Sequence, residues 1–276
     1  MDHTAIKHIQ DTAAAVALSK NSLDTASRFT PLAALPENFA IHSLERYLYG
    51  RARYRAALET KHIASFAAYH QEHGEHAPVF INPDAMSALA IFNLGDIESP
   101  GHGDDTASLR LEKTAPFKAY LAITQNGPHS QKAIAEWVED WRDHISAVGT
   151  DDTAIPVVTL AATLRNIDIE AARNVNSTAG DFSASRSAME SIEAKSTVGK
   201  LPKVVIFRCS PYHGLPEQDF RFRVTINTGD DKVKFSAQRI QEEADTEATA
   251  EMFTHVIATA LADDTTILQG TFKLGN

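Results

Sequence analysis

Short runs of alternating apolar and polar residues, separated by turn-forming residues, constrain the fold of this chain more than any other feature. Three such runs follow one another at residues 79–82, 87–92 and 107–111, and glycine or proline residues lie between them. A period of two places successive side chains on opposite faces of a strand, so each run predicts a β-strand. Strands joined by short connections pair most simply as antiparallel neighbours, so the centre of the chain is predicted to be an antiparallel sheet.

Helical periodicity flanks this predicted sheet. The strongest signal starts at Ser130, where Ile134, Val138, Trp141 and Ile145 form an apolar stripe at helical spacing. Ser43 and Ser65 are suitable helix caps. Helices are therefore predicted from residue 130 and at residues 4–20, 43–53, 65–74, 157–165 and 242–261. Further strands are predicted at residues 118–124, 167–171, 203–209, 220–228, 233–239 and 266–272.

These elements do not alternate as strict βαβ units, which favours an α+β fold with a mainly antiparallel sheet and flanking helices. The segment 21–38 contains prolines and is predicted to form an extended arm. Residues 149–156 are predicted to form a linker between subdomains. The predicted organisation is an N-terminal helix and arm (1–40), an α+β subdomain (41–150) and a β-rich subdomain with a C-terminal helix (151–276). The two subdomains are expected to be closely associated. Residues 174–187, rich in Ser, Asn, Ala and Gly, are expected to form a mobile loop.

Charge and cysteine content narrow the class of protein. The chain has 26 lysine and arginine residues against 36 aspartate and glutamate residues, a formal net charge of −10. This charge argues against a general DNA-coating role, although a local basic face would override it. Cys209 is the single cysteine and lies in an apolar strand pattern, which favours a buried thiol. No run approaches the roughly 18 apolar residues of a membrane helix, so a cytoplasmic protein without membrane contact is expected.

The loop at residues 100–105 is the first candidate site. His102, Asp104 and Asp105 lie within four residues of each other, and Gly101 and Gly103 lie among them. Imidazole and carboxylate groups bind divalent metals and also suit general acid–base catalysis. A divalent metal would need at least a third ligand from elsewhere. The alternative is a tight connection between strands in which Asp104 caps backbone N–H groups.

A basic and aromatic segment at residues 46–55 is the second candidate. Arginine binds phosphate and tyrosine stacks on bases, so this composition suits a single-stranded nucleic acid or a nucleotide. The same residues also build helix packing and oligomer interfaces, with the acidic residues of segment 136–143 as a partner. The residues in question are Arg46, Tyr47, Arg51, Arg53, Tyr54 and Arg55.

Other motifs exclude several chemistries. The histidines of HQEHGEH (70–76) lack the H-E-x-x-H spacing of metalloproteases and are more simply surface residues. The acidic residues Glu136, Glu139, Asp140 and Asp143 fit a solvated helix face better than a metal cluster. The chain has no G-x-x-x-x-G-K-[ST] phosphate loop and no G-x-S-x-G nucleophile motif.

Several segments resemble the family of prophage proteins typified by YfdQ. They are FNLGDIESPGHGDDTASLRLEKTAPF (92–117), IHSLERYL (41–48), AEWVEDW (135–141), SAMESIEAKS (187–196) and GLPEQDFRFRV (214–224). The resemblance implies a phage-borne gene, and it does not indicate a biochemical activity. The leading hypothesis is a prophage accessory protein that binds a nucleic-acid intermediate or a host factor. The alternatives are a metal-dependent hydrolase or nuclease that uses His102, Asp104 and Asp105, and a self-assembling structural or sequestering protein. A homo-oligomer is expected.

Overall fold

The computed structural model describes residues 3–24, 49–51, 53–74, 76–149, 151–167, 202–229 and 232–274. The chain forms two units, Met1–Tyr54 and Arg55–Asn276. In the first unit, helix α1 (His3–Asp24) confirms the helix predicted at residues 4–20 and continues into the segment predicted as an arm. Residues 49–51 and 53 are not helical, so the helix predicted to run through residue 53 does not reach them. The rest of that segment lies outside the described residues.

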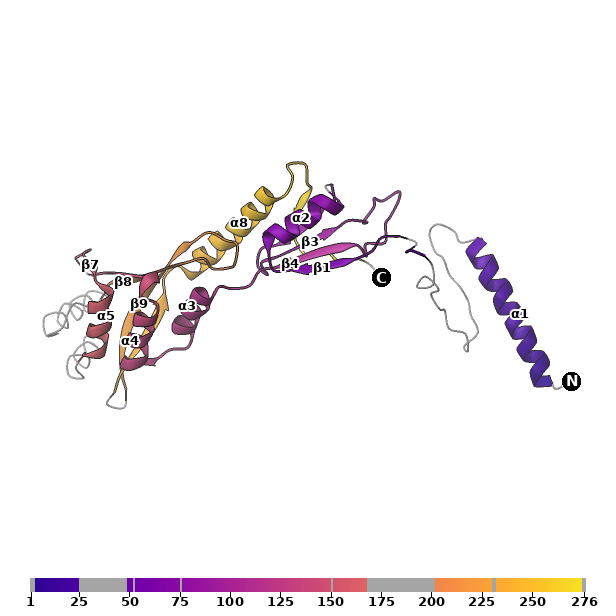
Figure 1. Cartoon of the computed structure of the whole chain (residues 1–276). Helices are drawn as coiled ribbons and strands as arrows, with labels where there is room; N and C mark the ends of the chain where they lie inside the picture. Colours follow the sequence, from indigo (N-terminus) through magenta and orange to yellow (C-terminus); the bar gives the residue numbers. More distant parts are fainter. Residues whose placement is uncertain are drawn as a thin grey trace. The chain divides into compact units, whose positions relative to one another are not determined.

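The second unit contains two sheets, and each sheet has helices packed beside it (Figure 1). Most strand pairs are antiparallel, which confirms the α+β fold class. No helix in the described ranges is long and apolar enough to span a membrane.

The first sheet has five strands in the order β1-β4-β3-β2-β11. The central strands β4, β3 and β2 are antiparallel and correspond, within one residue at their ends, to the three runs that predicted them. The edge strands β1 and β11 pair in parallel with β4 and β2. The bounds are β1 (Ala57–Thr60), β2 (Val79–Asn82), β3 (Ser87–Ile91), β4 (Thr106–Arg110) and β11 (Ile267–Gln269).

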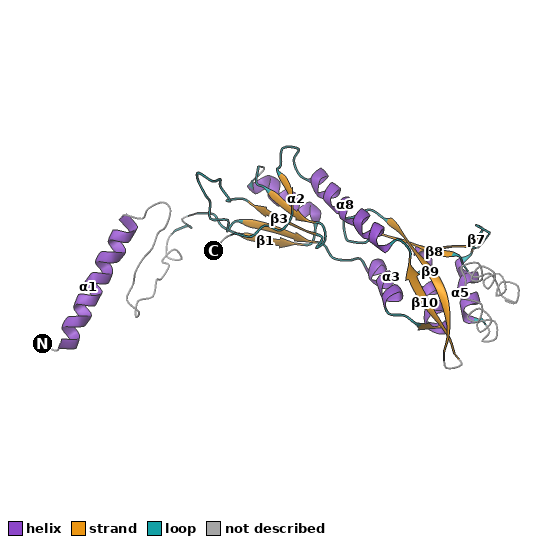
Figure 2. Cartoon of the chain, turned by 180° about the vertical axis from the view of Figure 1, so that it is seen from behind, coloured by secondary structure: helices purple, strands orange, loops and turns teal. Residues whose placement is uncertain are grey.

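Helices α2 (Ile63–His73) and α8 (Glu242–Ala260) cover one face of this sheet (Figure 2). Phe66 of α2 and Phe253 of α8 are fully buried against the inward side chains of the strands, among them Val79 and Ile81. Alternation in the strands follows from this arrangement, because only one face has helices to bury it. Helix α2 begins at Ile63 and not at Ser65, and it ends before Gly74 as predicted.

The second sheet has six antiparallel strands in the order β5-β10-β9-β8-β6-β7. Three helices pack against it, and Tyr120, Phe207 and Phe222 are fully buried in the shared core. The bounds are β5 (His129–Ser130), β6 (Ile145–Val148), β7 (Ala154–Ile155), β8 (Val204–Cys209), β9 (Gln218–Gly229), β10 (Lys232–Arg239), α3 (Ala115–Gln125), α4 (Gln131–Asp140) and α5 (Val157–Arg165).

Three local predictions for this half are corrected. Residues 118–124, predicted as a strand, belong to helix α3, because the Thr114 hydroxyl accepts a hydrogen bond from the Phe117 N–H at 3.3 Å and Pro116 lies in the first turn. Ser130 caps α4 as predicted, but α4 ends at Asp140 and Ile145 opens strand β6. Residues 149–156, predicted as a linker, include the turn between β6 and β7 and strand β7 itself.

Candidate functional site

The second face of the five-stranded sheet, turned away from α2 and α8, is the candidate site. A groove of about 980 Å³ lies over it, lined by outward residues of β1, β2, β3 and β4 and by residues 270–272. In Figures 1 and 2 both helices lie on the other side of this sheet. The volume lies in the range of small-molecule and nucleotide pockets. This face is therefore open and is not covered by the helices that bury the other face.

Two rows of side chains cross this face next to each other. Phe80, Leu89 and Ser108 are successive cross-strand neighbours on β2, β3 and β4. One pair further along the same strands, Asn82, Ser87 and Arg110 form the second row. A row that begins with the apolar side chains Phe80 and Leu89 thus runs beside a row with amide, hydroxyl and guanidinium groups. Such a pair of rows can hold a ligand with a flat apolar part and a polar or anionic part.

The aromatic row has a second ring above it. Phe272, in the segment that follows β11, stacks on Phe80 with ring centroids 4.3 Å apart and an interplanar angle of 23°. The Asn82 side-chain amide donates a hydrogen bond to the Thr271 hydroxyl at 3.0 Å. The end of the described chain therefore lies over the same face of the sheet as the groove.

The groove contains both acidic and basic side chains, and only some of them form ion pairs. The Lys61 ammonium bonds the Glu112 carboxylate at the rim, and this hydrogen bond holds the pKa of Glu112 below its usual value. Arg110 is exposed, and its guanidinium forms no ion pair within the described ranges. Glu59 on β1 is a further exposed carboxylate next to Ser108. Arg110 is thus the cation on this face that is available to an anionic ligand.

The side chain of Asn93, which precedes the loop at residues 100–105, forms hydrogen bonds with two residues of that loop. The Asn93 amide donates to Asp104 Oδ1 at 2.8 Å, and Asn93 Oδ1 accepts from the Asp105 N–H at 3.0 Å. Asp105 is buried, and its Oδ1 accepts from the Ala56 N–H at 3.2 Å. A Cβ at Gly101 would lie 1.9 Å from the Asn93 carbonyl oxygen, so this close turn requires glycine. Both carboxylates therefore hold the connection between β3 and β4 in shape.

His102 lies exposed in the same loop. Asp104 and Asp105 point their oxygens at Asn93 and Ala56, as the hydrogen bonds show. Among the described residues no group of three or more His, Cys, Asp or Glu side chains could hold a metal ion. Asp104 accepts a hydrogen bond from a side-chain amide, and it is the Asp105 carboxylate that accepts one from a backbone N–H.

The basic segment is only partly described. Arg46 and Tyr47 lie outside the described residues. Arg51, Arg53 and Tyr54 belong to the first unit, whereas Arg55 belongs to the second and lies two residues before β1. Tyr54 is exposed. The described residues form no helix here, so the structure does not gather these arginines on one helix face.

The three histidines of the 70–76 segment make separate contacts. His70 is buried on α2 and its Nε2 lies 2.9 Å from the Ala77 carbonyl oxygen. The His73 ring stacks on Tyr69 at 3.9 Å, and His76 lies 3.1 Å from an oxygen of Asp264. The sequence pattern therefore does not correspond to a common ligand site.

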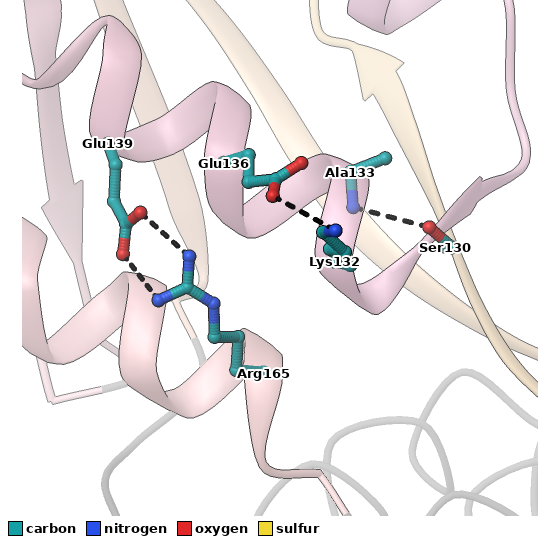
Figure 3. A network of polar contacts seen from close by, with 6 residues as sticks. All are labelled: Ser130, Lys132, Ala133, Glu136, Glu139 and Arg165. Atoms are coloured by element: carbon teal, nitrogen blue, oxygen red, sulfur yellow. Dashed lines mark hydrogen bonds and ion pairs between the residues drawn. The ribbon is translucent and has the colours of Figure 1, made fainter.

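The acidic face of α4 finds cations within the second unit. Arg165 of α5 donates two hydrogen bonds to Glu139, at 2.8 and 2.7 Å, and Lys132 lies 3.7 Å from Glu136 (Figure 3). Bidentate pairing of this kind fixes the two helices relative to each other. These two carboxylates thus have partners other than the basic segment 46–55. Cys209 is buried as predicted, and burial raises the pKa of its thiol to about 12.

Sequence reasoning did not single out the open face of the five-stranded sheet. The signal was present: Phe80 and Leu89 stand at the positions of their strands that alternate with the buried ones, where a solvated face would carry polar residues. Cross-strand register was needed to show that these two residues are neighbours, and that Arg110 lies beside them.

A family model described as "Uncharacterized conserved protein (DUF2303)" matches residues 2–272 of the chain. No curated protein and no solved structure matches it at a significant level.

Proposed function

We propose that this chain, which belongs to the DUF2303 family of uncharacterized conserved proteins, acts by binding a single-stranded nucleic-acid intermediate on the open face of its five-stranded sheet. The observation that carries the proposal is the pair of rows on that face: Phe80 and Leu89 beside Asn82, Ser87 and Arg110. The resemblance to YfdQ-like prophage proteins supports a phage accessory role.

The chemistry of the two rows suits a nucleotide strand. Unpaired bases stack on aromatic side chains, and sheets that carry such side chains on a face opposite their helices are a recurring platform for single strands. Phe80 provides the ring, and Arg110 provides a guanidinium that can bind a phosphate with two hydrogen bonds. The amide of Asn82 and the hydroxyl of Ser87 can contact base edges or sugars. Each component of a nucleotide thus has a partner on this face.

The net charge of −10 limits the strength of such binding. A negatively charged protein is repelled by phosphate at long range, so stacking must supply most of the affinity. Glu59 lies at the rim of the groove, where a carboxylate repels phosphate but can accept a hydrogen bond from an exocyclic base amine. We therefore expect a short site for a few nucleotides and not a continuous coat along a strand.

The test measures fluorescence anisotropy of a labelled oligothymidine and of the matching duplex. Phe80→Ala should weaken single-strand binding by about 5- to 150-fold, because stacking on one base contributes about 1–3 kcal/mol. Phe80→Leu keeps an apolar side chain without the ring and should also weaken binding. Arg110→Gln should reduce the slope of log K against log salt by about 0.7, the value for one phosphate contact on a single strand.

Arg223→Gln is the matched control, because it removes one exposed positive charge from β9 of the other sheet. It should leave binding unchanged. Equal effects of Arg110→Gln and Arg223→Gln would mean that only total charge matters, and the proposal would fail. Binding of neither single strand nor duplex by the wild type would also refute it, and the host-factor hypothesis would then be tested on the same face with the same variants.

A further inference from the structure

We infer that residues 270–274, which follow β11, are a built-in competitor of the ligand: the Phe272 ring occupies the position in which a base would stack on Phe80. The inference rests on the proposed function and adds a regulatory segment to it.

The geometry of the two rings leads to this conclusion. Their centroids are 4.3 Å apart and their planes differ by 23°, which is an offset-stacked pair. A nucleobase stacks on an aromatic side chain at a similar separation, so Phe272 and a base cannot share this face of Phe80. Phe272 also lines the groove itself. The Phe272 ring therefore lines the groove and also occupies the position above Phe80 in which a base would stack.

The segment is attached so that it can leave without disturbing the sheet. Strand β11 ends at Gln269, and the Gly270 N–H donates to the Ile81 carbonyl at 2.7 Å as the last backbone bond to β2. Beyond that point, the described contacts are the exposed hydrogen bond between Asn82 and Thr271, the stacked ring, and Leu274, which lies against Gly103 and is 48% exposed. None of these contacts belongs to the backbone pairing between β11 and β2, which ends at Gln269. Displacement of residues 271–274 therefore leaves the β11–β2 pairing intact.

Because a ligand must take the place of the Phe272 ring on Phe80, the kind of ligand that can bind is restricted. A group that replaces Phe272 must present a flat aromatic face, and a base inside a duplex has both faces covered by its neighbours. An unstacked base in a single strand has such a face, so the cover selects single strands over duplex. Asn82, which loses Thr271 as a partner when the segment leaves, becomes available to the edge of the incoming base. Release of the cover thus exposes the ring and an amide together.

The first experiment compares Phe272→Ala with Phe272→Tyr by oligothymidine anisotropy. Removal of the competing ring should tighten binding about 2- to 12-fold, because a stacked aromatic pair is worth about 0.5–1.5 kcal/mol. Phe272→Tyr keeps a stacking ring and should bind like the wild type. In the Phe80→Ala background, Phe272→Ala should have no further effect, since the two rings act through the same contact.

The second experiment places a reporter at the same position. In Phe272→Trp, the indole should stack on Phe80 in the free protein and move into water when oligothymidine binds, which shifts its emission to longer wavelength. Trp137 and Trp141 are partly buried against the core of the other sheet, so the wild-type protein gives the background signal.

The outcomes separate the inference from the function on which it rests. Weaker binding by Phe272→Ala, together with weaker binding by Phe80→Ala, would show that Phe272 is a contact for the ligand and would overturn the competitor role while the proposed function stands. An unshifted Phe272→Trp emission at saturating oligonucleotide would overturn it as well. Absence of binding by the wild type and by Phe272→Ala alike would remove the proposed function and the inference with it.

Discussion

The hydroxyl group of Tyr120 should lower the stability of the protein. Tyr120 lies on α3 in the core of the six-stranded sheet and is 1% exposed, and its Oη has no hydrogen-bond partner among the described residues. Burial removes the phenol from water and so raises its pKa above the ordinary value. Replacement by phenylalanine keeps the ring and removes only the unsatisfied group. We therefore expect Tyr120→Phe to be more stable than the wild type.

The expected gain is about 1 kcal/mol, the lower end of the penalty of about 1–3 kcal/mol for a buried group left without a partner. The lower end applies because Tyr120 lines a cavity of about 30 Å³ with Arg239, Asp245 and Thr249, and these polar groups soften the desolvation. Tyr120→Ala is the contrasting variant. It removes the stacked ring as well and should cost about 3–5 kcal/mol.

Urea unfolding followed by tryptophan fluorescence measures both effects. With a slope of about 2 kcal/mol per M, a gain of 1 kcal/mol raises the midpoint of Tyr120→Phe by about 0.5 M without a change of slope. The cavity is large enough for one water molecule. A Tyr120→Phe variant that is less stable by 1 kcal/mol or more would show that the hydroxyl makes a favourable hydrogen bond, to such a water or to a neighbouring side chain, and would refute the reasoning.

Two further predictions concern polar contacts. The Arg208 guanidinium donates two hydrogen bonds to Asp219, at 2.7 and 3.1 Å, and this hydrogen bonding lowers the pKa of Asp219. The stability that it contributes should be present above the unfolded pKa and be lost as pH falls through the folded pKa. Because both groups are partly exposed, Arg208→Gln should have only a small cost at neutral pH, and this cost should disappear as the pH falls through the lowered pKa of Asp219; an undiminished cost at acidic pH would contradict this. Asn93→Ala should lower stability by about 1–2 kcal/mol through loss of its bonds to Asp104 and Asp105, whereas a chelator should leave the melting temperature of the wild type unchanged; a drop on chelation would support a metal site in this loop.

Local patterns predicted most of the secondary structure because they depend on neighbouring residues. The alternation at residues 79–82 and the helix at residues 157–165 match β2 and α5 at both ends. The failure at residues 118–124 has a local cause that was overlooked: Thr114 and Pro116 form a helix start just upstream. The stripe that included Ile145 failed because a helical period can continue by chance past the end of a helix into a strand.

The candidate site was harder to predict than the fold. The loop at residues 100–105 drew attention because its titratable residues are close in sequence, yet the structure uses Asp104 and Asp105 to bond Asn93 and Ala56. The histidines of residues 70–76 were not favoured as a site, and in the structure His70, His73 and His76 turn to different partners, with His70 buried and not on the surface. Proximity along a chain does not say where a side chain points, because the partner that each group meets in the folded chain decides it.

The sequence by itself determined most of the strands and helices, that the strand pairing is mainly antiparallel, and that Cys209 is buried. These properties follow from periodicity, capping residues and short connections, all of which act over a few residues. Tertiary structure alone decided which face of the five-stranded sheet is covered and which is open. It also brought Phe272 onto Phe80, from almost 200 residues away in the chain, and aligned Arg110 with Ser87 and Asn82. The physical reason is that strand register and the placement of α8 result from the packing of the whole core, and no local pattern encodes them.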